Sequence, residues 1–217
     1  TTKRSIHKED GSIEMTTFTY DTMNRVVTTV TGMDTTTYLY DNAGNRFIKK
    51  ETDKTTLYLR HGQIAVAMDV EVNVDQSTEK GKKNRYLLSG DLIAGRICTT
   101  INSDDSTVVE KSWYHLDHLN STKMVTDENG EVEVNYIYRA FGEQLKRLDG
   151  TGADTDDSAK YSYGGKELDD VTNLYYFNAR YYDATIGRFI NVDPVQDGTN
   201  WYVYVSNNPL SFVDPTG

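Results

Sequence analysis

A short motif repeats about every 20 residues in the N-terminal half of the chain, and it restricts the fold more than any other feature. It reads YDTMNRV at residues 20–26 and YDNAGNRF at residues 40–47, where we align the two arginines by allowing one inserted residue. Each unit combines a strand that ends in Tyr, a polar turn of Asp, Asn or Gly, and a new strand that opens at Arg. Weaker copies follow at residues 58–63 and 136–143. Repeated hairpins predict a stacked architecture, in which neighbouring units cover each other's faces.

Composition and alternation extend this prediction to the whole chain. The only three prolines lie in the last 24 residues, so the first 193 positions carry no proline to interrupt paired strands. The chain contains 16 tyrosines and many threonines, which suit a half-buried pleated surface. Residues 14–20 and 131–138 alternate between two faces, and Asn129-Gly130 before the second run is a hairpin signal. The sequence therefore predicts an all-β fold, in which most tyrosines pack between strands.

Net charge, hydropathy and cysteine content limit the binding partners, membrane segments and disulfides that the chain can have. The formal net charge is −10, which disfavours binding of the chain itself to nucleic acid or to an anionic membrane surface. No apolar run is long enough for a membrane-spanning helix, and the first residues lack the apolar core of a signal peptide. The single cysteine, Cys98, excludes an internal disulfide and is expected to lie buried in a strand.

Two polar segments are predicted to be loops. Residues 75–84 contain no apolar side chain, and residues 149–157 are acidic and rich in glycine. The second segment divides the chain into hairpin repeats at 1–148, an acidic loop at 149–160 and a distinct C-terminal segment at 161–217. A calcium site in the acidic loop is an alternative, but the loop lacks the spacing of an EF-hand.

The C-terminal segment is dense in ordered sequence blocks. These are YGGKELD at 163–169, LYYFNARYYD at 174–183, IGRFI at 186–190, DP at 193–194, NWYVYV at 200–205, NNPL at 207–210 and DPTG at 214–217. Together they resemble the Rhs repeat-associated core of Rhs/YD-repeat proteins. Upstream, YDNAGNR at 40–46 and YHLDHLNST at 114–122 resemble the repeats of that family.

This resemblance implies an architecture and a set of partners. In the family, stacked hairpins form a hollow spiral β-shell around a C-terminal toxin or effector, and the core segment closes one end. The chain is too short for a whole shell and resembles its closing section. The implied partners are its own C-terminal toxin segment in cis and upstream repeats, with an immunity protein or a delivery-system component as further candidates. The implied location is that of a secreted or cell-surface bacterial protein, or of one delivered into target cells by a secretion system.

Two aspartates near the end of the chain suggest acid–base chemistry. Asp193 and Asp214 begin similar Asp-Pro turns on either side of residues 201–205, which look like a strand, and a return through residues 207–209 could bring the carboxylates together. Two adjacent carboxylates share a proton, so that one can act as a base toward water and the other as an acid. In the family, the matching aspartates are the proposed pair for self-cleavage, supported by the arginine that corresponds to Arg180. A guanidinium there could stabilise a carboxylate or a developing oxyanion.

The resemblance also locates the cut and its surroundings. The family cuts its chain just after a final Asp-Pro-x-Gly-Leu motif, so we expect cleavage just past Gly217. The leucine and the cargo would follow this chain, which is then a cleaved product, a segment that ends at the motif, or a member without cargo. The residues expected to support the site structurally are Arg188, as a donor to turn carbonyls, together with Gly187, Pro194, Pro215 and Gly217. Gln196 stands where many members carry glycine, which could weaken cleavage.

Non-catalytic interpretations stay open. Asp-Pro is a common turn dipeptide, so the chain could be a structural or adhesive repeat module, with some tyrosines stacking on carbohydrate. His115, Asp117 and His118 could bind a metal, but residues three apart on a strand face opposite sides. We therefore expect no metal or other cofactor, and enzymatic activity remains an open question restricted to a single self-cleavage.

Overall fold

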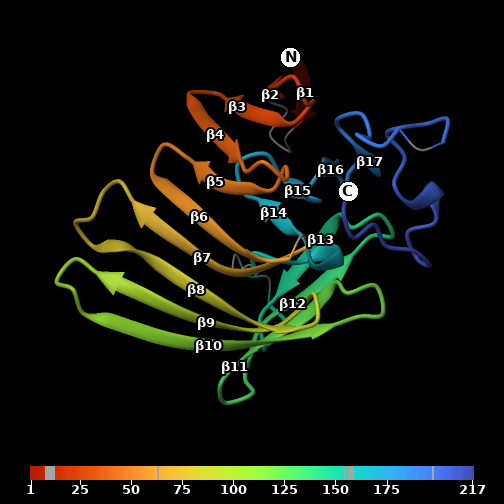
Figure 1. Cartoon of the computed structure of the whole chain (residues 1–217). Coiled ribbons are helices and arrows are strands. Elements are labelled where there is room, and N and C mark those ends of the chain that lie inside the picture. The colour runs from red at the N-terminus through yellow and green to blue at the C-terminus, as the bar shows by residue number, and fades with distance from the viewer. Residues whose placement is uncertain (8–12, 63, 154, 156–158, 197) are drawn as a thin grey trace.

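The chain folds into two antiparallel sheets, which confirms the all-β prediction (Figure 1). The computed structural model describes residues 1–7, 13–62, 64–153, 155, 159–196 and 198–217. Its larger sheet has thirteen strands in chain order: β1 (Thr2–His7), β2 (Ile13–Tyr20), β3 (Val26–Thr31), β4 (Asp34–Tyr40), β5 (Arg46–Lys50), β6 (Lys54–His61), β7 (Ala65–Asn73), β8 (Glu79–Ser89), β9 (Leu92–Asn102), β10 (Thr107–Leu116), β11 (Thr122–Asp127), β12 (Val132–Tyr138) and β13 (Gln144–Leu148). The smaller sheet has four: β14 (Glu167–Asp169), β15 (Leu174–Tyr176), β16 (Tyr181–Asp183) and β17 (Arg188–Phe189). Within the described residues the helices are two short 3-10 turns, Tyr163–Gly165 and Val205–Asn207.

One turn design recurs through the larger sheet. The first residue of the turn is an aspartate whose Oδ1 accepts the backbone N–H groups two and four residues later, as at Asp21, Asp41, Asp117, Asp127 and Asp149. The fourth residue is Asn or Gly with positive φ, for example 61° at Asn24 and 86° at Gly44. These are the residue types that tolerate the left-handed conformation, and a bulge beside the turns at Asp21, Asp41, Asp117 and Asp127 fixes the strand register. The repeat read from the sequence is therefore a repeated turn with one geometry.

The two repeat arginines are not equivalent, which corrects our alignment. Both turns have the same length, since Tyr20 pairs with Val26 and Tyr40 pairs with Arg46. Arg46 thus takes the inward position of Val26, and both are 1% exposed. Arg25 instead lies on the turn and forms an ion pair with Asp21. No residue is inserted between the copies, and the second arginine enters the core.

The larger sheet curls around the C-terminal segment. In Figure 1, β14 and β15 lie between β4–β6 on one side and β12–β13 on the other. Their contacts agree, because Phe18, Val26 and Tyr38 pack in one cluster with Leu174, Tyr176 and Tyr181. A second cluster consists of side chains of the C-terminal segment itself: Tyr163, Tyr175, Phe177, Tyr182, Ala184, Phe189 and Tyr204. The concave side of the sheet thus supplies the core, and the C-terminal segment fills it.

Buried ion pairs join the two sheets. Arg46 Nη2 lies 2.6 Å from Glu167 Oε2, and Lys49 Nζ lies 3.2 Å from Asp169 Oδ2. Burial alone raises the pKa of Glu167, but Arg46, Lys160 and Lys49 lower it below its ordinary value. A buried carboxylate requires such compensation, so these pairs fix the position of the C-terminal segment on the sheet.

Two local predictions are wrong. Residues 79–84 belong to strand β8, because their backbone pairs with both β7 and β9 and Asn84 donates to buried Asp69. The segment around residues 201–205 is not a strand: only Val203 forms a bridge, and Val205, Ser206 and Asn207 have positive φ. Tyr204 is buried by ring packing instead of strand pairing. In the predicted acidic loop, Asp149 closes a turn of the common design, and residues 154 and 156–158 lie outside the described residues.

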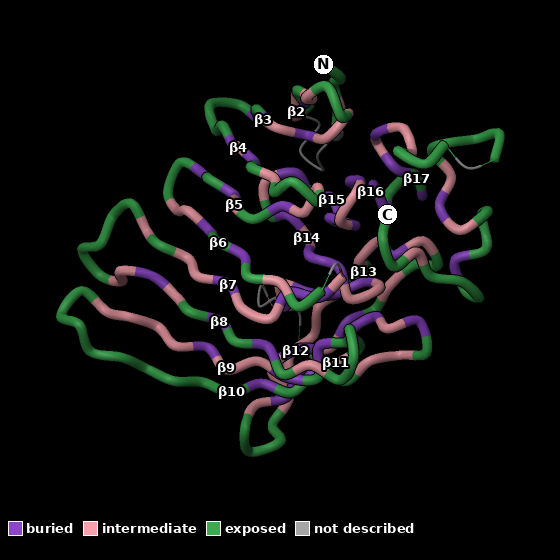
Figure 2. Tube along the Cα trace, viewed as in Figure 1, coloured by how far each residue is buried: buried purple, intermediate pink, exposed green. Residues whose placement is uncertain are grey.

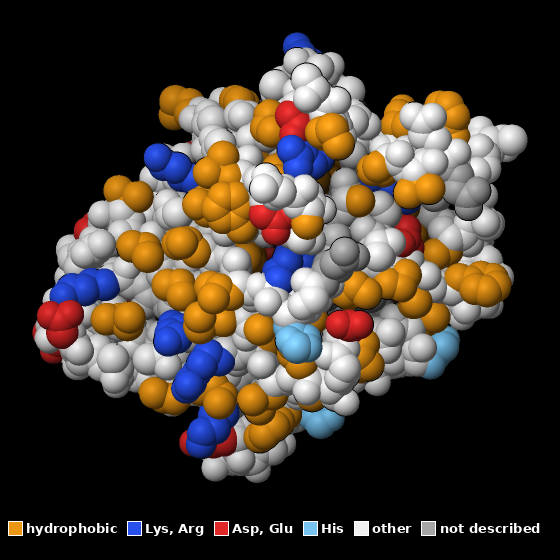
Figure 3. All heavy atoms as spheres, in the orientation of Figure 1, with side chains coloured by type: hydrophobic (Ala, Val, Ile, Leu, Met, Phe, Trp, Pro, Cys, Tyr) orange, Lys and Arg blue, Asp and Glu red, His pale blue; other side chains and the backbone are white. Residues whose placement is uncertain are grey.

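Exposure follows the alternation. Most of the tyrosines are buried and pack against other rings, as predicted, while Tyr202 is 41% exposed. Figure 2 shows buried positions through β14–β16 and at intervals along β4–β9, whereas the outer hairpin turns are exposed. Apolar side chains such as Leu59 and Trp113 point outward. On the face seen in Figure 3, hydrophobic side chains are spread out with lysines and arginines between them.

Candidate functional site

Arg180, Asp193 and Asp214 meet at one place. Arg180 lies in the turn between β15 and β16, and its Nη2 is 3.5 Å from Asp193 Oδ2 and 3.4 Å from Asp214 Oδ2. The arginine side chain is 5% exposed, whereas the aspartates are 18% and 21% exposed, so water reaches the carboxylates. Within the described residues no hydrogen bond joins the two carboxylates directly. The three predicted catalytic side chains therefore form one cluster with the guanidinium between the two acids.

The two Asp-Pro turns have closely similar geometries. Asp193 Oδ1 accepts the N–H of Val195, two residues later, and Asp214 Oδ1 accepts the N–H of Thr216. The fourth residue is left-handed in both turns, with φ of 56° at Gln196 and 83° at Gly217. Residues other than Gly, Asn and Asp are disfavoured at such φ values. Gln196 thus occupies a position that suits glycine, for a backbone reason.

Gly217 is tightly enclosed. A Cβ atom at this position would lie 2.0 Å from the backbone oxygen of Phe177, so no larger residue fits without movement. The Gly217 carbonyl oxygen accepts a hydrogen bond of 2.8 Å from Arg180 Nε. The same guanidinium therefore contacts both carboxylates and the last carbonyl of the motif.

The other carbonyls of the final turn are also held. The Pro215 oxygen accepts hydrogen bonds from Lys166 Nζ at 2.5 Å and from Asn178 Nδ2 at 3.2 Å. The Thr216 oxygen accepts the backbone N–H of Ala179 at 3.1 Å. Each carbonyl from residue 215 to residue 217 thus has a donor, and all the donors come from residues 166–180.

Packing and backbone contacts orient Arg180. Its guanidinium carbon lies 3.7 Å from the centre of the Phe189 ring, and its Nη1 donates to the Trp201 carbonyl at 3.0 Å. The Trp201 carbonyl also accepts the N–H of Asp193. Burial lowers the pKa of Arg180, while Asp193 and Asp214 act in the opposite direction. An arginine stays charged under such shifts, so the cluster holds a fixed cation.

A repeat turn positions the first aspartate. Asn191 Nδ2 donates to the Asn24 carbonyl at 3.0 Å, and Asn24 Nδ2 donates to the Val192 carbonyl at 3.4 Å. The segment that leads into Asp193 is therefore held by the turn between β2 and β3. The site depends on both the repeats and the C-terminal segment.

The predicted supporting residues differ in what they contact. Gly187 has φ of 66°, and a Cβ there would lie 2.8 Å from the Phe141 ring, so the fold requires glycine. Arg188 is exposed, and its side chain has no hydrogen bond or ion pair to the described residues. Its backbone pairs with Asp183 and Val203, so the expected side-chain donation to turn carbonyls is not observed. Pro194 lines a hollow of about 340 Å³ beside the first Asp-Pro turn.

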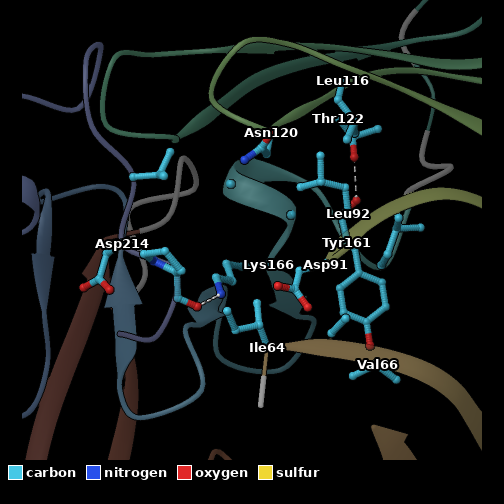
Figure 4. A pocket seen from close by; sticks show the side chains of 16 residues that line it. Ile64, Val66, Asp91, Leu92, Leu116, Asn120, Thr122, Tyr161, Lys166 and Asp214 are labelled. Atoms are coloured by element: carbon cyan, nitrogen blue, oxygen red, sulfur yellow. Dashed lines mark hydrogen bonds between the residues drawn. The ribbon is translucent and has the colours of Figure 1, made fainter. Parts of the chain in front are cut away.

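Sequence reasoning missed two donors of the final turn, Lys166 and Asn178. Both lie inside the blocks that carry the family resemblance, so their place in the motif was the available signal. Lys166 lines a cavity of about 260 Å³ together with Asp214, and Figure 4 shows the lysine reaching toward the turn. The apolar wall of this cavity includes Ile64, Val66 and Leu92.

The other candidates have structural contacts. His115 bonds to Thr126, His118 bonds to the Leu210 carbonyl, and Asp117 caps its own turn. Among the residues that the structure describes, no cluster of three or more His, Cys, Asp or Glu side chains is arranged to hold a metal. Cys98 is buried in β9, as expected, and burial raises the pKa of its thiol.

Comparison with known proteins shows the family to which the chain belongs. No protein-family model matches the chain. It is 31% identical to the double-stranded DNA deaminase toxin A of Burkholderia cenocepacia over 97% of its length, and 31% identical to the tRNA3(Ser)-specific nuclease WapA of Bacillus spizizenii over 93%. It is also 35% identical to toxin subunit YenC1 of Yersinia entomophaga over 48% of its length. The chain belongs to the Rhs/YD-repeat family. The chain spans 16%, 8% and 11% of the lengths of these relatives.

Solved structures share this Rhs fold. The TcdB2–TccC3–TEV crystal structure superposes with a TM-score of 0.76 at 20% identity, over 93% of this chain and 10% of that one. The Photorhabdus luminescens Tc holotoxin pore gives a TM-score of 0.64 at 19% identity, over 99% of this chain and 10% of that one. Two of the named sequence relatives, those of Burkholderia cenocepacia and Yersinia entomophaga, are a toxin and a toxin subunit, which fits a secreted or delivered protein. In the described ranges of this Rhs segment, no helix is long and apolar enough to cross a membrane.

Proposed function

We propose that this Rhs segment is the closing section of a β-shell that encloses a C-terminal toxin of the same polypeptide. Support comes from the toxin relatives and from the curled sheet, whose concave side holds the C-terminal segment. The proposal keeps the division into repeats at 1–148, an acidic loop at 149–160 and a core segment at 161–217. The repeats supply the wall, and the core segment closes the end. The toxin segment in cis, further repeats and a delivery component are the partners that this proposal requires.

The second part of the proposal is that the site releases the toxin by hydrolysing the peptide bond that follows Gly217. One of Asp193 and Asp214 removes a proton from water, and the hydroxide adds to the Gly217 carbonyl carbon. Arg180 Nε, 2.8 Å from that carbonyl oxygen, stabilises the oxyanion that develops. The carboxyl group that took the proton from water then gives it to the leaving nitrogen as the C–N bond breaks, while the other carboxylate keeps Arg180 in place. The products are a carboxylate at Gly217 and a free amine on the toxin.

The observation that carries this proposal is the position of Arg180. One guanidinium contacts both carboxylates and the carbonyl of the expected cleavage point. A pair of ordinary turn aspartates does not require such a group. Asp127, for example, caps its turn in the same way, but the hydrogen bonds that it accepts within the described residues come from Asn129 and Glu131 of its own turn and not from an arginine.

The test is intact-mass spectrometry of the chain extended by its natural downstream residues. Wild type is expected to give a product that ends at or just past Gly217, and Asp193→Asn, Asp214→Asn and Arg180→Ala are expected to stay intact. Asp127→Asn is the matched control, because it changes an aspartate of the same turn type away from Arg180, and it should be cut like wild type. A folded wild-type chain that stays intact would leave a structural or adhesive module. Cleavage that survives both aspartate changes would exclude this pair.

A further inference from the structure

Lys166 is a buried cation without a carboxylate partner. It is 6% exposed, and within the described residues no carboxylate lies within 4.0 Å of its Nζ. The other core cations differ, since buried Arg46 and Lys49 and part-buried Lys160 each form ion pairs. Removing a charge from water without a counterion is costly, and such groups often mark functional sites.

What Lys166 contacts is the final turn of the proposed cleavage site. Its Nζ donates to the Pro215 carbonyl at 2.5 Å and lies 5.4 Å from the centre of the Phe177 ring. Phe177 is the residue whose backbone encloses Gly217. Lys166 therefore holds one peptide group of the final turn and packs on the residue that encloses Gly217, so both of its contacts converge on one turn.

We infer that Lys166 is a positioning residue for cleavage: its ammonium fixes the Pro215 peptide and so sets Asp214 and the Gly217 carbonyl relative to Arg180. The inference rests on the proposed self-cleavage. Asp214 precedes the bound peptide directly, and Gly217 follows it by two residues. A shift in this peptide therefore moves an acid–base group and the reacting carbonyl together.

The charge state of Lys166 supplies a readout that a packing role would not. The pKa of Lys166 is lowered to about 8, chiefly by burial; Asp214 acts in the opposite direction, Arg60 contributes to the lowering, and Asp91 opposes it. These are the charged groups that face it, from the final turn, from β6 and from the turn before β9. The ammonium is therefore mostly charged at pH 7 and mostly neutral above pH 9.

A matched control lies in the repeat sheet. Lys123 Nζ donates to the Tyr136 carbonyl at 2.9 Å and lies 5.5 Å from the centre of the Tyr138 ring. These contacts are the same two kinds that Lys166 makes, but Lys123 has no contact with the final turn. Lys123→Met thus removes the same two kinds of interaction from an exposed lysine away from the site.

The experiment follows the cleavage rate of the extended chain, made in a short cell-free pulse and transferred to buffers from pH 5 to pH 10. At pH 7, Lys166→Met should be cut about 10- to 100-fold more slowly than wild type, as expected for a misplaced reacting group, and Lys123→Met should be cut at the wild-type rate. The ratio of wild-type to Lys166→Met rates should shrink as the pH rises through 8. The cleavage rate of Lys166→Arg should not fall between pH 7 and pH 9, because the arginine keeps its charge over this range.

Each outcome decides the inference. Equal rates for Lys166→Met and Lys123→Met, or a rate ratio that does not change with pH, would overturn it. If Lys166→Met does not fold, the pH profile of the Lys166→Arg cleavage rate decides the inference. A fall in that rate near pH 8 would overturn it, because this variant has no lysine at position 166 to lose its proton. Wild type that stays intact, or Asp214→Asn that is still cut, would overturn the proposed cleavage and this role with it. A wild type that cuts alongside an equally active Lys166→Met would overturn the role of Lys166 alone.

Discussion

Replacing Arg46 tests whether buried ion pairs hold the C-terminal segment in place. Arg46→Met keeps the length of the side chain and removes its charge, leaving Glu167 buried without its closest cation. The arginine donates to Glu167 at 2.6 Å and to the Tyr181 hydroxyl at 2.8 Å, and its guanidinium lies 4.2 Å from the centre of the Tyr176 ring. All of these contacts join β5 to the smaller sheet.

The expected magnitude follows from burial. Arg46 is 1% exposed and Glu167 is 4% exposed, and breaking such a pair by removing one partner costs about 3–5 kcal/mol of unfolding free energy. Arg25 is the comparison, because it also has an acid and a ring beside it, Asp21 and Tyr40, but lies on a turn. That pair is about a quarter exposed, so Arg25→Met should cost about 1 kcal/mol or less.

Equilibrium unfolding in urea at pH 7, followed by circular dichroism, measures both variants against wild type. The double variant Arg46→Met/Glu167→Gln should recover part of the loss, because it removes the unpaired carboxylate that Arg46→Met leaves behind. Equal losses for Arg46→Met and Arg25→Met would refute the argument from burial. A double variant less stable than Arg46→Met would show that the carboxylate does not need its partner.

Three further outcomes are expected. Gln196→Gly should raise the unfolding free energy by about 1 kcal/mol, because glycine tolerates a φ of 56°; a loss of stability in the same urea assay would contradict this. Gly217→Ala should slow cleavage of the extended chain about 100-fold, because the new Cβ meets the Phe177 carbonyl, and an unchanged rate by intact mass would exclude that contact as a constraint. The folded-state pKa of Glu167 is lowered, so the stability that its ionised form contributes is complete above the unfolded pKa near 4.5 and is lost as the pH falls through the folded pKa. Below pH 4.5, the urea midpoint should therefore fall less steeply with pH in Glu167→Gln than in wild type. Parallel plots of midpoint against pH for the two proteins would be inconsistent with this linkage.

Local rules account for the correct predictions. Alternation in residues 14–20 and 131–138 directly specifies which side chains face the core, because successive residues of a strand point to opposite faces. The aspartate turns were equally predictable, since the acid bonds its own backbone and Asn or Gly takes the left-handed position. Neither feature needs a distant residue.

The two wrong secondary-structure predictions share one cause, which is contact with residues far away in the sequence. Residues 79–84 looked like a loop because they are polar, but β7 and β9 pair with them and Asp69 bonds Asn84. Residues 201–205 looked like a strand, but they turn so that Tyr204 packs on Tyr182 and Phe189. In both cases a partner far along the chain outweighs the local pattern.

By itself the sequence determined the all-β class, the turn geometry and the family resemblance, and it singled out Arg180, Asp193 and Asp214 as candidates. The tertiary structure alone decided which groups meet: that Arg46 enters the core while Arg25 stays on a turn, and that Lys166 reaches the Pro215 carbonyl. The physical reason is range. Turns and alternation depend on neighbours a few residues apart, whereas burial and charge pairing depend on how the sheet curls around the C-terminal segment.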